Sequence, residues 1–252
     1  MPTTIQLPAA DGSTTPARPR HTTRYAIAAG AVLVFGVSAL TIANQAMTKQ
    51  DDQTQFTTDG VRELVINQDA GDITLVAGSI AGQVRVTTTR SWSWQQPPFT
   101  HTVKDGVLTL TGESPPFPRL GNSDVDQEVT VPPGVTVRVD VRAGNVRATG
   151  LDAPHFEVKT ESGSIDATDL DVTAFSATTS SGSIRASLYG ATERVNARTS
   201  AGSVELTVPD ATYTVDANTS SGQVRIQVTD APDAARLISA HTSSGDVTIR
   251  HR

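Results

Sequence analysis

Cysteine is absent from this chain of 252 residues, and aromatic residues make up only 4% of it. Without cysteine there are no disulfides, no thiolate nucleophile and no cysteine-ligated metal. Few aromatic residues and frequent Thr, Ser, Val, Ala and Gly favour short strands and tight turns around a thin core. We therefore expect an all-β protein that is stabilised by strand ladders and close packing.

Positive charge is also scarce. The formal net charge is -6, and Lys and Arg form no cluster along the sequence. Nucleic-acid binding needs such clusters, because Lys and Arg neutralise the phosphates. The composition therefore excludes nucleic acid as a partner.

Only one apolar run is long enough to cross a membrane. Residues 25–43 carry no charge, and their length is close to the ~20 residues that span the hydrocarbon of a bilayer as a helix. Arg18, Arg20 and Arg24 precede the run, so the positive-inside rule predicts a cytoplasmic N-terminus. We predict a disordered cytoplasmic leader over residues 1–23.

The same reasoning makes residues 24–43 a transmembrane signal anchor of a single-pass cell-membrane protein. The C-terminal domain is then extracellular or periplasmic. Two other interpretations stay open for this run. Small residues at Thr41 and Ala43 would suit a signal peptidase, which gives a cleaved signal peptide, and a buried core helix is the second alternative.

A short unit recurs after a polar stalk that we predict over residues 44–60. Its copies read SGSIDA, SGSIRA, AGSVEL, SGQVRI and SGDVTI, and their glycines are spaced by 19, 20, 20 and 23 residues. Such repeats indicate one structural unit stacked in series. A sharp corner in each unit needs a residue that tolerates positive φ. The glycines that we assign to repeat corners are Gly71, Gly144, Gly163, Gly182, Gly202, Gly222 and Gly245.

Apolar residues alternate on both sides of each corner glycine, as they do on a strand with one buried face. Around Gly182, for example, Phe175 and Ala177 precede the glycine, and Ile184 and Ala186 follow it. Each repeat is therefore predicted to consist of two inward-facing strands joined at the corner.

Outward residues three positions after the glycine favour a solenoid over a hairpin meander or sandwich. Asp166, Arg185, Glu205 and Arg225 alternate in sign, so in-register stacking of successive coils would place opposite charges side by side. We predict a single-stranded parallel β-helix, or solenoid, of about 19–20-residue coils over residues 61–252.

The order of these motifs resembles a known family. VPPGVTVRV, then RAGNVRA, then the series TSSGSI, TSAGSV, TSSGQV and TSSGDV is similar to a bacterial family of candidate adhesins built from β-strand repeats, whose function is unknown. The resemblance covers about residues 61–252. It implies a right-handed, single-stranded parallel β-helix, commonly behind a membrane anchor, and it brings no established catalytic residues.

No residue pattern indicates chemistry. The five histidines lack metal-ligand spacing, and the acidic clusters at 124–126 and 166–171 match no calcium-binding loop. A carbohydrate-active enzyme would need two carboxylates in one groove. The carboxylates considered for that role are Glu157, Glu161, Asp166 and Glu205. We predict no catalytic, metal-binding or cofactor-binding residue.

Trp92 and Trp94 are the candidate contacts for a ligand or partner. They lie in an irregular insert at about residues 90–121, two positions apart, which places both on one side of a strand. Exposed indoles stack on sugars or anchor partner proteins. The same two side chains would also serve to cover the end or the side of the solenoid.

The sequence thus predicts a non-enzymatic, membrane-anchored, adhesin-like binding or scaffold protein of the bacterial envelope. Its expected partners are the membrane, through the anchor, and cell-wall glycan, a membrane protein or further copies of itself. Two alternatives stay open: a carbohydrate-active enzyme on a β-helix, and an accessory protein of an envelope-stress sensing system.

Overall fold

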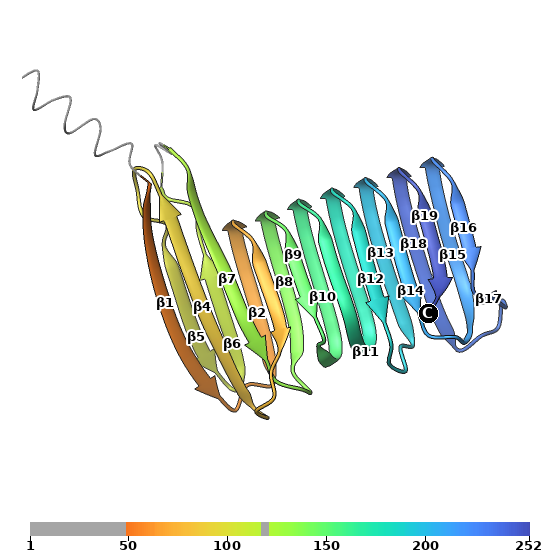
Figure 1. Cartoon of the computed structure of the whole chain (residues 1–252), viewed down its shortest axis with the longest axis horizontal. Helices are drawn as coiled ribbons and strands as arrows, with labels where there is room; N and C mark the ends of the chain where they lie inside the picture. Colours follow the sequence, from red (N-terminus) through yellow and green to blue (C-terminus); the bar gives the residue numbers. More distant parts are fainter. Residues whose placement is uncertain (1–48, 117–120) are drawn as a thin grey trace, which may run out of the picture. The chain divides into compact units, whose positions relative to one another are not determined.

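The computed structural model describes residues 49–116 and 121–252. Every regular element in these two ranges is a β-strand (Figure 1), so the all-β prediction is confirmed. Within the same ranges, no helix has the length and hydropathy that a membrane crossing requires. The predicted leader at 1–23 and the predicted anchor at 24–43 lie outside the described residues.

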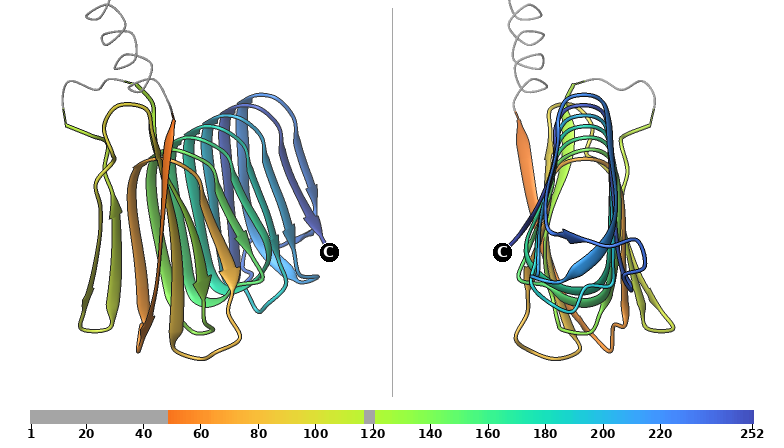
Figure 2. Two further views of the ribbon diagram at one scale, coloured as in Figure 1. Left: turned by 60° about the vertical axis from the view of Figure 1, so that its left-hand side comes forward. Right: turned by 90° about the vertical axis from the view of Figure 1, so that its right-hand side faces the viewer.

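The strands form two faces that become the long sides of a flattened ring when the stack is viewed along its length (Figure 2). In spatial order, face A consists of β1 (Gln50–Asp59), β4 (Gln83–Trp92), β7 (Ser123–Val131), β3 (Ile73–Ala77), β9 (Val146–Thr149), β11 (Ile165–Ser181), β12 (Ile184–Leu188), β14 (Val204–Val208), β19 (Val247–His251) and β16 (Val224–Gln227). Face B consists of β5 (Phe99–Lys104), β6 (Val107–Gly112), β2 (Glu63–Ala70), β8 (Thr136–Ala143), β10 (Asp152–Ser162), β11, β13 (Arg194–Ala201), β18 (Arg236–Ser244), β15 (Thr212–Ser221) and β17 (Thr229–Asp230). The long strand β11 contributes its first half to face A and its second half to face B.

Neighbouring coils of the regular stack pair in parallel and in register. On face B, Phe156 lies opposite Val137 on one side and Phe175 on the other. On face A, Ile184 lies between Ile165 and Val204. The inward columns of the repeat therefore stack on themselves, which confirms the predicted in-register pairing of the coils.

These stacked columns form the core. The inward residues of the central coils are almost fully buried, and Ile184 and Val204 have no exposed surface. The rings of Phe156 and Phe175, 5.9 Å apart between centroids, are among its largest side chains. Small residues such as Ala177 and Ala186 fill the rest of the column, which keeps the two faces close together.

The coils do not follow one another in chain order, which the repeat pattern did not predict. The last pair of strands, β18 and β19, lies between β13–β14 and β15–β16. Thr248 consequently separates Glu205 from Arg225, so the predicted pairing of these two charges does not occur. The inward columns of all coils are alike, and for that reason they fix the register of a coil without fixing its position in the stack.

The N-terminal part of the domain also departs from the predicted solenoid. The segment expected to be a polar stalk contains β1, which pairs antiparallel with β4 along its whole length. β4 in turn pairs antiparallel with β7, and the irregular insert contains the antiparallel pair β5–β6. β1 carries a single large apolar residue, Phe56, among polar ones, and this explains why its sequence resembles a stalk.

Each of the seven predicted corner glycines lies between a strand segment of face B and the segment of face A that follows it in the chain. At Gly182, φ is +149° and an added Cβ would overlap the carbonyl oxygen of Gly163 in the next coil. Both the backbone angle and the contact require glycine at this position. The corners of neighbouring coils therefore pack backbone against backbone.

Candidate functional site

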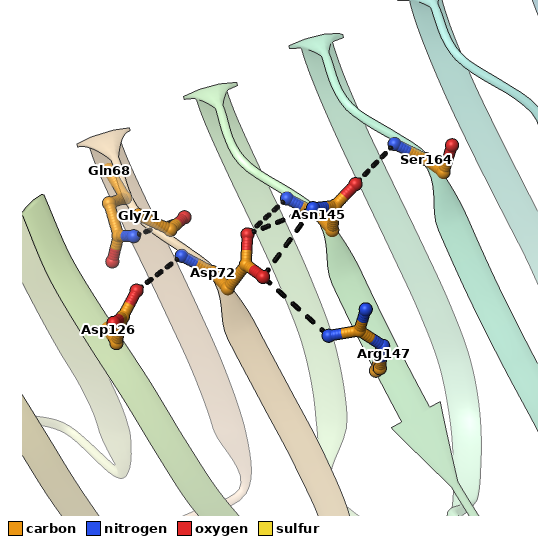
Figure 3. Close-up of polar contacts among 7 residues, drawn as sticks. All are labelled: Gln68, Gly71, Asp72, Asp126, Asn145, Arg147 and Ser164. Carbon is orange, nitrogen blue, oxygen red and sulfur yellow. Dashed lines mark hydrogen bonds and ion pairs between the residues drawn. The ribbon is translucent and has the colours of Figure 1, made fainter.

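A ladder of hydrogen bonds runs along the corners, and Asp72 lies near its start (Figure 3). The Asp72 carboxylate accepts hydrogen bonds from the backbone amide of Asn145 at 2.9 Å and from its side-chain Nδ2 at 3.1 Å. The amide of Asp72 donates to the Asp126 carboxylate at 2.8 Å. Arg147 lies 3.6 Å from Asp72 and partly balances its charge.

The same contact repeats from coil to coil beyond Asn145. The side-chain oxygen after each corner glycine accepts a hydrogen bond from the backbone amide at the equivalent position of the next coil. In spatial order, the acceptors are Asn145, Ser164, Ser183, Ser203 and Asp246, at 2.9–3.3 Å. Because the ladder satisfies corner amides, these polar residues have a structural role.

The acidic clusters have similar structural explanations. Asp126 accepts the amide of Asp72, and Asp169 lies 3.3 Å from Arg252. Across residues 49–116 and 121–252, no three acidic or histidine side chains gather in a way that could hold a metal ion.

The four carboxylates considered for glycoside hydrolysis do not share a groove. Glu157 and Glu161 belong to β10 on face B, whereas Asp166 and Glu205 belong to β11 and β14 on face A. Glu205 is held between Arg185 at 3.1 Å and Arg250 at 2.9 Å. Glu157 and Glu161 therefore lie on the outside of face B, and Asp166 and Glu205 lie on the outside of face A.

Trp92 and Trp94 lie near the beginning of the described domain. Trp92 is the last residue of β4 and pairs with Gln50, the first residue of β1. Trp94 follows the strand in a bend and is 55% exposed, whereas Trp92 is half-buried. The two indoles therefore do not continue along one side of a single strand, although they stay close in sequence at the same edge.

Face B carries a polar surface that the sequence did not single out. A cavity of about 380 Å³ is lined by Phe156, Ala174 and Phe175 together with the polar residues Arg138, His155, Glu157, Ser176, Arg194 and Asn196. A neighbouring cavity of about 260 Å³ shares Arg138 and Glu157 with it and adds Asn67. We call the outward residues of this surface the face B track. It consists of Asn67, Arg138, Asp140, Glu157, Arg194 and Asn196.

The face B track contains both hydrogen-bond donors and acceptors: guanidinium groups, carboxylates and side-chain amides. Arg138 lies between Glu63 at 3.6 Å and Glu157 at 3.7 Å, and both partners are solvent-accessible. The side-chain oxygen of Asn196 is covered and has no hydrogen-bond partner among the described protein atoms. Such an acceptor is stabilised when a ligand donor or an ordered water reaches it. Sequence reasoning missed the track because its residues come from strands distant in the chain.

Comparison with known proteins adds the family. The model of the Toastrack DUF4097 family matches residues 119–250, more than half of the chain. This chain belongs to the Toastrack DUF4097 family. The family predicted from the repeated Ser-Gly units, similar to candidate adhesins of unknown function, is confirmed.

Solved structures similar to this toastrack chain have low sequence identity to it. They include a candidate cell-adhesion protein from Clostridium sporogenes, at 12% identity over 81% of this chain and 100% of that chain, with a TM-score of 0.48. A candidate adhesin from Bacteroides fragilis shares 14% identity over 82% and 99% of the two chains, with a TM-score of 0.36. A candidate lipid-binding protein from Parabacteroides distasonis shares 11% over 79% and 96%, also at 0.36. No curated protein matches the sequence.

Proposed function

We propose that this toastrack chain is a non-enzymatic, adhesin-like binding and scaffold protein of the bacterial envelope, and that its coils wind right-handed. In this proposal the helix at 24–43 anchors it in the membrane, its N-terminus is cytoplasmic, and residues 49–252 lie outside. The ligand that we propose for the face B track is an extended polymer rich in hydroxyl groups, such as cell-wall glycan.

The face B track is the observation that carries this proposal. Its side chains come from β2, β8, β10 and β13, strands of one face that repeat at about 4.8 Å. A row of guanidinium, carboxylate and amide groups across several strands of one face suits a long ligand that contacts these strands at once. The parallel ladder holds these groups on a rigid surface, which lowers the entropic cost of binding.

The separation of the carboxylates supports a binding role over hydrolysis. Hydrolysis of a glycosidic bond needs two carboxyl groups within about 5–10 Å of each other on one groove. Glu157 and Glu161 lie four residues apart on one strand, about 13 Å, on the face opposite Asp166 and Glu205. Asp166 and Glu205 share face A, but Glu205 is held in ion pairs with Arg185 and Arg250.

The position of the tryptophans supports the membrane part of the proposal. The apolar run ends at residue 43, and the described domain starts with β1 at Gln50, which lies beside Trp92. Trp94 is exposed near this start of the domain. Tryptophan is enriched at membrane interfaces, because the indole is apolar with one polar N–H group. Trp92 and Trp94 are therefore proposed as contacts with the membrane or with a partner held close to it.

The ligand is tested by retention of residues 47–252 on insoluble cell wall, beside a fraction of solubilised membrane proteins. The variant Arg138→Ala/Arg194→Ala removes two cations from the face B track. Arg147→Ala/Arg185→Ala removes two from face A and is the matched control. Binding to wall that only the face B variant loses would support the proposal.

Other outcomes of this experiment are informative. Equal loss in both variants would indicate nonspecific charge attraction and contradict a site on face B. Capture of one membrane protein without binding to wall would favour the accessory role in envelope-stress sensing. Release of reducing sugar from the wall would contradict the non-enzymatic role.

Topology is tested separately, because the chain has no cysteine of its own. A single cysteine at Thr14 or at Gln96 is labelled in intact cells with a maleimide that cannot cross the cytoplasmic membrane. The proposal predicts labelling at position 96 and none at position 14 until the cells are lysed. Labelling at neither position would contradict an external domain.

A further inference from the structure

The two ends of the stack differ in how the space between face A and face B is covered. At the N-terminal end, Phe56 of β1 on face A stacks on His101 of β5 on face B, with ring centroids 4.0 Å apart and planes 18° apart. This contact closes the space between the two faces. Both edge strands at this end are rich in polar side chains, which is how proteins commonly protect exposed edges.

The opposite end is open. β15 and β16 form the outermost coil, and β16 pairs with β19 on one edge only among the described strands. Val224 is 39% exposed and Ile226 is 41% exposed. The residues beside them in the next coil, Val247 and Ile249, are completely buried.

On face B the end is covered only at its beginning. β17 pairs with β15 at Thr212 and Tyr213, and the Asp230 carboxylate of β17 accepts the amide of Val215 at 3.1 Å; the edge from Asp216 to Ser221 has no strand partner among the described residues. Val215 and Ala217 are half-buried there, although the equivalent residues of the other regular coils are buried. The end therefore presents two free strand edges with an apolar strip between them.

The shape of this end restricts what can cover it. A single extended peptide would pair with one edge and leave the other edge and the apolar strip exposed. Within the described chain, the surface that fits such an end is another coil, since β18–β19 covers the other side of β15–β16 in this way. We propose that a second copy of this chain covers the open end, so that two chains associate end to end through β15 and β16.

A two-fold axis parallel to the strands gives both free edges a partner. Such an axis places β16 of one copy antiparallel to β15 of the other, and the reverse, so that both edges gain partners. β16 carries one charged residue, Arg225, which lies 3.5 Å from Asp246, and β15 carries one, Asp216, which lies 3.1 Å from His241. Each of these charges has a partner in its own coil or the next one, so the contact brings no row of like charges together. Because the other end is closed, association stops at a dimer.

The proposal is tested first on the full-length chain by sedimentation equilibrium in detergent, with the mass of bound detergent subtracted. The wild type is expected to be a dimer. Ile226→Lys places two like charges at the shared end and is expected to give a folded monomer with the circular dichroism of the wild type, because the side chain is 41% exposed in a single copy. Val103→Lys is the matched control, since Val103 is 50% exposed at the closed end, and it is expected to remain dimeric.

A second measurement locates the contact. In the cysteine-free chain, Asn218→Cys and Gln227→Cys are introduced together, on β15 and β16, and the protein is treated with a short bis-maleimide. A cross-linked dimer is expected from the double variant and not from Thr102→Cys on β5. A monomeric wild type, a dimer that resists Ile226→Lys, or a dimer lost in Val103→Lys would each overturn the proposal. These results do not depend on the face B track or on the membrane anchor.

Discussion

The regular stack from β8 to β19 and the N-terminal part from β1 to β7 share one core but are built by different pairing. In the stack, every coil pairs in parallel with coils of the same sequence pattern. In the N-terminal part, β1, β4 and β7 pair antiparallel, and so do β5 and β6. Each repeat of the stack is stabilised by pairing with a neighbouring repeat of the same pattern. At the N-terminal end, strands of a different pattern pair antiparallel and end the stack.

The largest expected effect is the loss of stability when a charge enters a buried column of the stack, compared with the same change in β1 of the N-terminal part. Ile184→Asp puts an unpaired charge into a column with no exposed surface, and we expect a loss of at least about 4 kcal/mol in the free energy of unfolding, enough to unfold the domain. Phe56→Asp in β1 should cost less, because Phe56 is only half-buried. Circular dichroism and thermal melting measure both. Retained melting in Ile184→Asp would contradict the stacked core.

The second comparison concerns two glycines. Gly182→Ala brings a Cβ onto the backbone of the next coil at positive φ, and we expect a loss of about 3 kcal/mol. Gly134→Ala, in the turn between β7 and β8, also has positive φ but meets no atom within 4 Å, and should cost about 1 kcal/mol. Urea unfolding distinguishes the two. Equal losses would show that corner packing adds nothing to the backbone angle.

A third prediction tests the join between the two regions. Asp72→Ala removes the acceptor of two hydrogen bonds from Asn145, at the corner where β2–β3 meets β8–β9, and should cost about 1–2 kcal/mol. Ser183→Ala removes one such bond within the stack, so we expect at most about 1 kcal/mol. Hydrogen exchange at Asn145 should rise in the first variant. A larger loss for Ser183→Ala would place the weak point inside the stack.

The smallest expected effect depends on pH and concerns the open end. Burial raises the pKa of Tyr213, whose hydroxyl donates to the Pro209 carbonyl at 3.0 Å. The neutral phenol is favoured in the folded chain, so its contribution to stability is complete below the ordinary tyrosine pKa of about 10 and is lost as the pH rises above it. Tyr213→Phe should weaken this alkaline loss, measured by melting temperature from neutral to alkaline pH. An unchanged profile would assign the loss to other groups.

The sequence was sufficient to predict the coils but not their order. Alternation around residues such as Ile184 and the recurring corner glycines define two strands per coil and their register, since each column is apolar at fixed positions. The position of β18–β19 between earlier coils could not be predicted. Val247 lies beside Val204 in the structure, but Val224 has the same size and the same place in the repeat and would fit there equally well.

The binding surfaces were less predictable than the coils. The face B track combines residues from four strands, β2, β8, β10 and β13, whose outward positions follow no repeating pattern in the sequence. Trp92 and Trp94 could be identified from composition alone, yet the end of β4 at Trp92 separates their environments. The strand at Gln50–Asp59 was missed because it pairs through its backbone and buries little.

The intercalated coil has a consequence for the order of folding. β15 and β16 come before β18 and β19 in the sequence, yet β18 and β19 lie between them and the earlier coil β13–β14. While residues 236–251 are still being synthesised, β15–β16 can stack directly on β13–β14, since every coil offers the same apolar column. This early arrangement must open again to admit β18–β19, so we expect refolding to show a slow phase that is absent when residues 229–252 are deleted.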